Sequence, residues 1–567
     1  MIVGIDLGTT NSAAAVWQDG KPVLIPNPLG DFLTPSAVAV AEDGSLLIGL
    51  AARERMVTDP ASAKTLFKRT MGTSARFALG RGRYSSEELS SMVLRGLKAD
   101  IEAYTGERID RAVITVPAYF NDKQRKATRR AGELAGFAVE RLVNEPTAAA
   151  LAYGIHELDE ESPFLVFDLG GGTFDVSIVE IFDGIIEVRS SAGNNRLGGE
   201  DFNTVLANLA LQQIGRRDWK PALDPRLQEV LRAASERVRR QLTEQDETMF
   251  GFVWQDERYE TVIAAAAFEE AAGALIDSLR EPVVRALRDG GVRVEELSEI
   301  VMVGGATRMP IVRRAVTRMF GRFPSTNVHP DHAVALGAAV QGALQERDAA
   351  LKEIRLTDVC PFTLGVESAE HLPGGGIRSG LFSPIIERNT VVPASRVEMF
   401  QTMRDGQRSV ELGIYQGESR FVAENVKLGT VTIPVPPKRA GEISLQCRFS
   451  YDSSGLLEVD VTVPETGQAR QLVIVDDDEQ ANGKDVARRR AELARLKLHP
   501  RDEAANAAVL ERAKRCYEEN IGERRTHVAA LISGFETALD GQDPRRVSTA
   551  RDEVVRALDE IEGERIL

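Results

Sequence analysis

The 567-residue sequence has few cysteines, no long apolar run and no surplus of positive charge. Its three cysteines, Cys360, Cys447 and Cys516, lie far apart and form no CxxC pair. They argue against a disulfide framework and a zinc site, and they indicate a reducing compartment. No stretch approaches the roughly 18 apolar residues that a membrane-spanning helix needs. Because Met1–Asp6 reaches a carboxylate without a basic stretch, we expect no signal peptide and a cytoplasmic location.

The charge balance disfavours two classes of partner. Lys and Arg number 70 and Asp and Glu number 85, so the net charge is −15. Nonspecific binding to nucleic acid or to an anionic membrane needs a surplus of basic residues. The composition, 43% hydrophobic and 27% charged, is otherwise ordinary for a soluble globular protein. The length exceeds what one hydrophobic core can hold, so we expect two to four domains.

Three regions with different sequence patterns follow one another along the chain. In residues 1–350, short apolar strands such as Ala112–Val116 alternate with amphipathic helices, which predicts an α/β domain. Residues 359–478 consist of short alternating segments between turn residues, typical of a β-sandwich. Residues 479–567 carry apolar residues three and four apart, which predicts helices. We interpret residues 351–358 as the linker between the first two parts.

One internal repeat carries the strongest signal. Ile5–Thr10 is echoed by Phe167–Thr173, and each segment joins an apolar strand to another strand-like run. The repeat predicts two duplicated lobes, each opening with a β-hairpin whose turn is rich in Gly and Thr. Such turns expose backbone N–H groups and hydroxyls, so two of them across a cleft would bind a nucleotide's phosphates. The alternative is a pair of ordinary hairpin turns. A P-loop is excluded because GxxxxGK[ST] is absent and a strand follows each turn.

Two further features fit a nucleotide. Asp6 and Asp168 begin the two turns at equivalent positions, and paired carboxylates beside phosphates suit Mg²⁺, which takes few protein ligands. A third glycine turn, Val303–Arg308, ends a strand and precedes a predicted helix over Pro310–Phe320. Such a place suits the base and ribose of the same nucleotide. A plain strand-to-helix turn is the equal alternative.

Together these motifs resemble those of the DnaK-type (seventy-kilodalton) heat-shock chaperones. The motifs that carry the resemblance, in the family's order, are Gly4–Asn11, Val143–Ala150, Phe167–Asp175, Leu197–Phe202 and Val303–Arg308. The compact length, with Leu66–Gly72 and Ser383–Asn389, looks most like the HscC branch. The resemblance covers essentially the whole chain. It implies a multidomain protein: an α/β actin-like ATPase domain of ribonuclease H-like duplicated lobes, a linker, an all-β substrate-binding sandwich and a short α-helical lid.

The resemblance implies that the first domain binds ATP or ADP with Mg²⁺ and K⁺. The catalytic residues that it implies are Lys68, Glu145, Asp168, Thr173, Asp175 and Asp6. Of these, Asp6, Glu145 and Asp168 would hold Mg²⁺, mainly through water. The implied nucleotide-binding residues are Gly8, Thr9, Thr10, Asn11, Gly170, Gly171, Gly172, Thr173, Gly199, Glu200, Asp201, Glu236, Arg239, Arg240, Thr243, Gly304, Gly305, Arg308 and Asp331.

Some of these positions have alternatives or depart from the family pattern. Without the resemblance, Lys68 would be read as a solvated lysine beside Arg69. Arg239, Thr243 and Ala306 stand where the family usually has Lys, Ser and Ser. Because Arg can stack on a base as well as donate hydrogen bonds, we expect ATP binding with altered affinity.

The resemblance also implies residues that couple the domains. Pro117, Arg125, Leu356 and Asp358 match positions that link nucleotide state to the neighbouring domain. The family linker is usually a run of leucines, whereas this one reads Ile-Arg-Leu-Thr-Asp at residues 354–358. Losing apolar side chains should weaken its docking on the ATPase domain, so we expect altered coupling. A strand-ending Pro and a solvated Arg are the structural alternatives for the first two positions.

In the sandwich, the resemblance implies an apolar pocket for an extended peptide. Val366, Phe400 and Val410 match that pocket, and Ala369 and Met403 match the two residues that arch over the peptide. The small and large residues of the arch are exchanged relative to the bacterial pattern. A pocket of this kind, combined with main-chain hydrogen bonds, tolerates many sequences. For each of these residues, the plain core of a sandwich is the alternative.

The function that we predict is an ATP-dependent chaperone that binds extended apolar segments of unfolded client proteins. The family implies a J-domain co-chaperone, while the short segment Gln245–Val262 leaves an exchange factor open. We expect a monomer, with no nucleic acid or membrane partner. The alternatives are a small-molecule kinase or a filament-forming ATPase on the same fold, or a relative that binds ATP without cycling. The roughly 200 residues after residue 350, a length typical of one or two more domains, argue against the first two.

Overall fold

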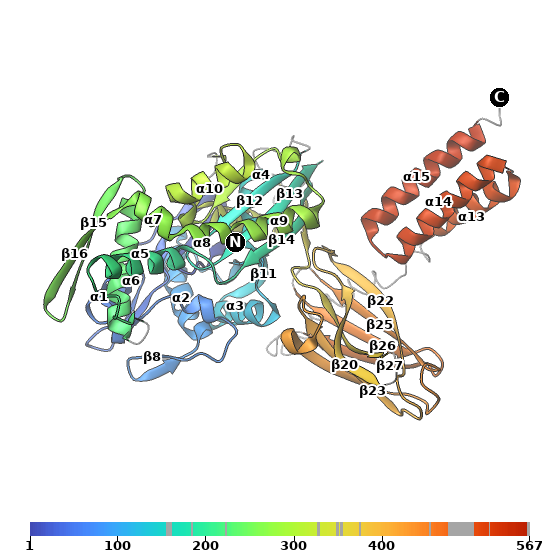
Figure 1. Ribbon diagram of the computed structural model, residues 1–567, viewed down its shortest axis with the longest axis horizontal. Helices are drawn as coiled ribbons and strands as arrows, with labels where there is room; N and C mark the ends of the chain where they lie inside the picture. Colours follow the sequence, from blue (N-terminus) through green and yellow to red (C-terminus); the bar gives the residue numbers. More distant parts are fainter. Residues whose placement is uncertain are drawn as a thin grey trace. The chain divides into compact units, whose positions relative to one another are not determined.

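Figure 1 shows the computed structural model of the chain. The structure describes all residues except 155–161, 183–184, 222–223, 326–328, 348–350, 352–354, 373–375, 453–454, 475–503, 521 and 564–567. The chain divides into two units, Met1–Phe362 and Thr363–Leu567. The predicted domain ends at residues 350 and 478 lie outside the described residues, as does the start of the predicted helical segment.

The first half of Met1–Phe362 is built on a sheet with the strand order β11-β10-β1-β2-β3. The central strand β1 (Ile2–Asp6) pairs in parallel with β10 (Arg111–Val116) and antiparallel with β2 (Asn11–Gln18). Ile2–Ile5 is fully buried, as in a strand covered on both faces. The remaining strands of this sheet are β3 (Lys21–Ile25), β4 (Thr34–Pro35) and β11 (Ala138–Asn144).

Two capped helices pack against each other in this half. α2 (Ser86–Thr105) begins with a capping box formed by Ser85 and Glu88. α3 (Asp122–Leu134) begins with a second capping box, in which the side chains of Asn121 and Gln124 bond each other's backbone N–H groups. The smaller elements are β5 (Val38–Val40), β6 (Leu46–Ile48), α1 (Leu50–Thr58), η1 (Pro60–Ser62), β7 (Ala63–Lys64), η2 (Phe67–Thr70), β8 (Phe77–Leu79) and β9 (Gly82–Tyr84).

The second half repeats this plan. Its main sheet runs in the order β17-β12-β13-β14-β18, and the hairpin of β12 (Phe164–Leu169) and β13 (Phe174–Phe182) is the counterpart of β1–β2. The sequence repeat therefore predicted both hairpins correctly. The remaining strands are β14 (Ile185–Asn194), β17 (Ile300–Val303), β18 (Arg355–Val359) and the hairpin β15 (Glu247–Trp254) with β16 (Glu257–Ala264). The helices and 3₁₀ turns are α5 (Gly199–Gln213), α6 (Pro225–Gln241), α7 (Ala265–Ala271), α8 (Gly273–Ser278), α9 (Arg280–Gly290), η4 (Val294–Glu296), η5 (Gly305–Arg308) and α10 (Pro310–Phe320).

Two helices rich in small residues, α4 (Glu145–Gly154) and α11 (Ala333–Gln345), pack closely beside the first sheet. A Cβ atom at Gly4 of β1 would lie 2.1 Å from the backbone nitrogen of Ala339. A Cβ atom at Gly337 would lie 1.6 Å from the carbonyl oxygen of Ala148 in α4. Glycine is required at both positions because the backbones approach this closely.

The second unit begins with two four-stranded antiparallel sheets, ordered β20-β19-β23-β24 and β22-β25-β26-β27. This agrees with the predicted β-sandwich, drawn in yellow and orange in Figure 1. In β25, Leu445, Cys447 and Phe449 alternate inward and are fully buried, which is the period-2 pattern of a core-facing strand. The strands are β19 (Leu364–His371), β20 (Ile377–Ile386), β21 (Val391–Val392), β22 (Ala394–Gln401), β23 (Ser409–Gln416), β24 (Val426–Pro434), β25 (Ser444–Tyr451), β26 (Leu457–Val463) and β27 (Gln468–Ile474), with the 3₁₀ turn η7 (Val422–Glu424).

The described end of the chain forms three packed helices, α13 (Ala504–Glu519), α14 (Gly522–Asp540) and α15 (Pro544–Gly563). Their shared core includes Cys516 and Phe535. All three cysteines of the chain are buried and take no part in a disulfide, so they contribute to packing. None of the helices that the structure describes is both long enough and apolar enough to cross a membrane.

Candidate active site

The two hairpin turns meet at one cavity of about 510 Å³, a volume typical of small-molecule sites. The turns contribute to it from β1–β2 and from β12–β13. Most of the residues that the sequence singled out line this cavity: Asp6, Gly8, Thr9, Thr10, Asn11, Lys68, Glu145, Asp168, Gly170, Gly171, Thr173, Gly199, Glu236, Arg239, Arg240, Thr243, Gly304, Gly305, Arg308 and Asp331.

The turns approach each other so closely that the second one requires glycine. A Cβ atom at Gly171 would lie 1.9 Å from Thr10 Oγ1, and one at Gly172 would lie 2.8 Å from Thr9 Cγ2. Thr10 Oγ1 is buried and has no hydrogen-bond partner in the described part of the chain. A buried hydroxyl without a partner is costly, so this atom is ready to bond a ligand.

A buried ion pair forms one wall of the cavity. Lys68 Nζ lies 2.7 Å from Glu145 Oε1, and Nζ also lies 5.6 Å from the centroid of the Phe120 ring. Lys68 is only 2% exposed, so the alternative of a solvated lysine is wrong. Its place is set by η2, which begins after Leu66 in the left-handed backbone region. Because a buried charge is tolerated only when it is paired, each partner holds the other in the cavity wall.

Several buried carboxyl groups surround this one lysine. Burial raises the pKa of Asp6 to about 7, and the Glu145 carboxylate adds to the rise. Burial, followed by repulsion from Glu145, raises the pKa of Asp175 to about 8. The pKa of Asp168 is raised well above its usual value for the same reasons. These carboxyl groups would ionise together only with a further positive charge beside Lys68, so the site favours binding of a cation.

The carboxyl groups are held in fixed orientations. Thr115 Oγ1 donates to Asp6 Oδ1 at 3.2 Å, and the Tyr119 N–H donates to Asp175 Oδ1 at 3.2 Å. Asp168 and Asp175 stand opposite each other in the β12–β13 register. Asp175 is buried behind the cavity lining, whereas Asp6 and Asp168 line the cavity.

The donor set fits Mg²⁺ held through water. Among the residues that the structure describes, no three His, Cys, Asp or Glu side chains come close enough together to coordinate a metal ion directly. Asp168 Oδ2 is buried without a hydrogen-bond partner in the same part of the chain. A hydrated ion suits such a site, because Mg²⁺ usually keeps several waters and takes one or two carboxylates.

Arginines form the other end of the cavity. Arg239 Nε donates to Asn203 Oδ1 at 2.9 Å, and Arg240 pairs with Glu236 at 2.6 Å. Arg308, from η5, pairs with Asp331 at 3.3 Å. The cavity therefore has guanidinium groups from α6 and from η5, and such groups can stack on a planar base.

Besides Asp175, three predicted residues support the cavity without lining it. Glu200 is buried, accepts from Asn203 Nδ2 and lies 3.5 Å from Arg232. Asp201 accepts from the Gly198 N–H at 2.8 Å. Gly172 packs against Thr9 behind the second turn.

Sequence reasoning gave no role to Arg69, although it is part of this site. Arg69 Nη2 lies 2.6 Å from Asp201 Oδ2, which ties η2 to α5. Its Nε is buried with no hydrogen-bond partner within the described residues. Its position next to Lys68 in the motif Leu66–Gly72 is the feature of the sequence that could have identified it. Ala306 lines the cavity from within the motif Val303–Arg308, although the sequence analysis did not assign it to the site. The remaining lining residues, Leu33, Glu244, Met309, Arg313, Pro330 and Val334, lie in no motif that marks them as binding residues.

A hydrogen-bond chain joins the linker to the first sheet. Arg125 Nη2 donates to Asn144 Oδ1 at 2.5 Å, and Asn144 Nδ2 donates to Asp358 Oδ2 at 2.9 Å. Arg125 also donates to the carbonyl of Ala118, the residue after Pro117. Sequence reasoning missed Asn144, which directly precedes Glu145 in the motif Val143–Ala150 and bridges the predicted pair.

The described part of the linker is a strand. In β18, Leu356 pairs with Ile186 of β14 in a parallel register. This docking uses the backbone, so it does not depend on the leucines that the family linker usually carries. Burial raises the pKa of Asp358, and the guanidinium groups of Arg141 and Arg125 oppose the rise. Residues 352–354 of the predicted linker lie outside the described residues.

The residues predicted for peptide binding lie on both sheets of the sandwich. Val366 of β19 is fully buried, and Val410 of β23 lies in the same sheet. Phe400 belongs to β22 in the other sheet, where it pairs with Leu445. Ala369 lies at an irregularity in the β19–β20 pairing, and Met403 lies in the loop after β22. Val366 therefore also fits the plain-core alternative.

Comparison with family models gives a single assignment for nearly the whole chain. A model described as Hsp70 protein matches residues 2–564. Members of that family are ATP-dependent chaperones with ATPase activity, which bind nucleotide with Mg²⁺, client polypeptides and J-domain co-chaperones. The kinase and filament alternatives are not favoured by this match. The chain therefore belongs to the Hsp70 family of ATP-dependent chaperones.

Proposed function

We propose that the cavity between the two hairpin turns binds ATP and hydrolyses it to ADP and phosphate, and that this reaction controls peptide binding by the sandwich. The observation that carries the proposal is the convergence of both turns on the buried Lys68–Glu145 pair. Thr9, Thr10 and the turn 170–173 would bind the phosphate oxygens through hydroxyls and backbone N–H groups. Arg239, Arg240 and Arg308 would hold the adenosine.

Hydrolysis needs positioning and charge neutralisation, with no covalent intermediate. We assign Lys68 to positioning the attacking water and the γ-phosphate, with Glu145 holding its ammonium group 2.7 Å away. Asp175, oriented by the Tyr119 N–H, helps to order that water, and Thr173 contacts the γ-phosphate from the second turn. Arg69, with its unpaired Nε, adds positive charge near the same turn.

Mg²⁺ bound with the nucleotide would supply charge that neutralises the phosphate oxygens. The residues that would hold its water ligands are Asp6, Glu145 and Asp168, and the family resemblance adds K⁺. The unpartnered Asp168 Oδ2 and the raised carboxyl pKa values support this assignment.

We propose that nucleotide state reaches the peptide site through Arg125, Asn144 and Asp358. The hydrogen bonds that join these three residues end on β18, the strand that leads directly into the sandwich. Two nucleotide states that favour different positions of this strand would differ in peptide affinity. The sandwich would hold an extended apolar peptide at Val366, Phe400 and Val410 under Ala369 and Met403, and the helices within residues 479–567 would close over it.

We further propose that unfolded polypeptides are the clients and that a J-domain co-chaperone stimulates hydrolysis in a monomeric, cytoplasmic protein. The closer relation to the HscC branch and the need for an exchange factor stay predictions. They rest on the compact length and on the short β15–β16 hairpin.

The test is the release of a fluorescent apolar peptide from the full chain with ATP and with ADP. We expect release to be about tenfold faster with ATP, a common size of coupling between sites. Asn144→Ala should bring the two rates together while ATP hydrolysis continues. Thr357→Ala, beside Asp358 in the same strand, is the matched control and should keep the difference. Equal rates in the unaltered protein would refute the coupling.

A further inference from the structure

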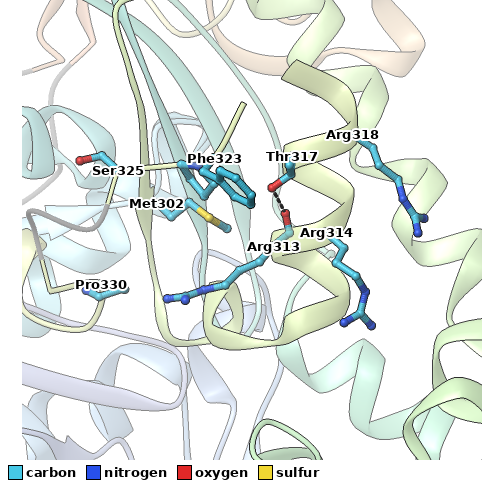
Figure 2. Close-up of a pocket in the computed structure, with 9 residues that line it drawn as sticks. Met302, Arg313, Arg314, Thr317, Arg318, Phe323, Ser325 and Pro330 are labelled. Carbon is cyan, nitrogen blue, oxygen red and sulfur yellow. Dashed lines mark hydrogen bonds between the residues drawn. The ribbon is translucent and has the colours of Figure 1, made fainter. Parts of the chain in front are cut away.

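A second cavity, of about 630 Å³, lies beside the nucleotide cavity and has no part in the proposed reaction. It is lined by Met302, Arg313, Arg314, Thr317, Arg318, Phe323, Pro324, Ser325 and Pro330, from β17, α10 and the segment after it. Figure 2 shows Phe323 and Met302 together facing α10, with the Arg313 side chain reaching from the helix toward Pro330. Arg313 and Pro330 line both cavities, whereas Phe323 lines only this one.

The cavity presents apolar surface to the outside. Phe323 is 86% exposed, the most exposed large apolar side chain among the described residues. Beside it, Pro324 and Pro330 add apolar lining, and Met302, itself only 4% exposed, lines the same cavity. Aromatic residues, Met and Arg are the residue types enriched at the centres of protein interfaces, where an apolar anchor fills a pocket. The hollow is thus suited to receive an apolar side chain.

The same region carries unbalanced positive charge. Residues 308–323 contain five arginines and no Asp or Glu, in a chain whose net charge is −15. Arg308 pairs with Asp331 and Arg314 with Glu269, whereas Arg322 donates only to the carbonyls of Ser298 and Val294 in the described structure. Arg313 and Arg318 have no ion pair within the described residues. A ligand with carboxylates would balance them.

We propose that this cavity is a docking site for an acidic segment of another protein that carries one large apolar side chain. The apolar side chain enters the hollow between Phe323 and Met302, and a carboxylate beside it pairs with Arg313. Charge complementarity selects the segment and the apolar anchor supplies the affinity. The site is separate from peptide binding by the sandwich, which takes apolar segments without a demand for acidic residues.

Single-stranded nucleic acid is the competing occupant, because arginines and an exposed aromatic ring can also bind it. Two observations favour protein. Nucleic acid binding uses several stacking rings along a basic groove, whereas Phe323 is the one aromatic residue lining this cavity among the residues described. The overall charge of −15 would also slow the approach of a polyanion of that length.

The test is fluorescence anisotropy of the full chain with a short labelled peptide of Asp, Glu and Gly around one central Phe. An excess of unlabelled, uncharged apolar peptide occupies the sandwich throughout. We expect Arg313→Glu and Phe323→Ser each to weaken binding about tenfold or more, as for interface anchors. The matched controls are Arg288→Glu, an exposed arginine of α9, and Val253→Ser, an exposed valine of β15. Both should bind the probe as the unaltered protein does.

Three results decide the matter. A peptide with Lys in place of the acidic residues should bind Arg313→Glu better than the unaltered protein, which a merely misfolded variant cannot do. The proposal would be overturned if Arg313→Glu bound the probe as tightly as Arg288→Glu does. It would also be overturned if a probe with Ser in place of the central Phe bound the unaltered protein equally well. Displacement of the probe by a single-stranded oligonucleotide that itself requires Arg313 would assign the surface to nucleic acid. Nucleotide binding by Phe323→Ser, measured in parallel, is expected to be normal, so the outcome does not depend on the proposed ATPase function.

Discussion

The two hairpins that face the proposed nucleotide cavity share a backbone plan and differ at one register position. In β1–β2 the residue opposite Asp6 is Ala13, whereas in β12–β13 the residue opposite Asp168 is Asp175. The first turn presents two threonine hydroxyls, and the second presents three glycines that let those threonines approach.

This difference shows how a duplicated fold acquires one asymmetric site. The second hairpin supplies the extra carboxyl group, while the first half supplies Lys68 and Glu145 from elements outside its hairpin. Two similar hairpins thus form the cavity, and the residues that differ between the two halves divide the charged groups. The predictions below alter one side at a time.

The largest effect is expected at Lys68, the buried cation that pairs with Glu145. Lys68→Ala should lower the rate of ATP hydrolysis by about 10³-fold, because a charged group that stabilises the transition state is lost. ATP should still bind, since the turns and arginines remain. Single-turnover hydrolysis and equilibrium ATP binding measure the two effects. Normal turnover in this variant would remove Lys68 from the mechanism.

Ala13→Asp would make the first hairpin resemble the second. Ala13 is buried against Ala335 and Ala339, so a carboxylate there has no room and no partner. We expect a loss of about 3 kcal/mol in the free energy of unfolding at neutral pH. Ala13→Asn, of equal size and without charge, should lose less, and the gap between the two should shrink as the pH falls. An identical loss at all pH values would mean that volume alone is responsible.

Local patterns in the sequence predicted the two hairpins and their turns, whereas most of the other cavity-lining residues, such as Lys68 and Glu236, were predicted from the family resemblance. Gly and Thr between two apolar strands specify a turn, and the repeat of Asp6 at Asp168 specifies that two turns belong together. Contacts between residues far apart in the sequence were harder to predict, because no local pattern marks them. Asn144 bridges Arg125 and Asp358 over more than 200 residues of sequence, and Arg69 pairs with Asp201, which lies 132 residues away. Phe323 lies in no motif. Its side chain is exposed, so the periodic pattern that marks buried core positions does not identify it either.

Asp175→Asn would remove the additional carboxyl group of the second hairpin, which the first hairpin lacks at Ala13. The pKa of Asp175 is raised to about 8, so the folded, nucleotide-free protein favours the protonated form. Its contribution to stability is therefore fully present below about pH 4 and is lost as the pH rises toward 8. Asp175→Asn should flatten the fall of the melting temperature over this range, leaving the part due to Asp6, whose pKa is about 7, and to Asp168, whose pKa is also raised. An unchanged slope would show that Asp175 is ionised throughout.

The same variant should slow hydrolysis by about 10- to 100-fold, in the range of a group that orders a water or accepts its proton. Asp277→Asn, at a position of α8 outside the cavity lining, is the matched control and should leave both the slope and the rate unchanged.

The smallest effect is expected where the two turns touch. Gly171→Ala places a Cβ atom 1.9 Å from Thr10 Oγ1, so the turns must separate. We expect a cost of about 1 to 2 kcal/mol in the free energy of unfolding and weaker ATP binding, as for overpacking elsewhere. Thr10→Ala removes the clashing oxygen, and the double variant should recover part of the stability that Gly171→Ala loses. Chemical denaturation of the two single variants and the double variant gives the coupling between the positions. Additive losses would show that the turns do not press on each other.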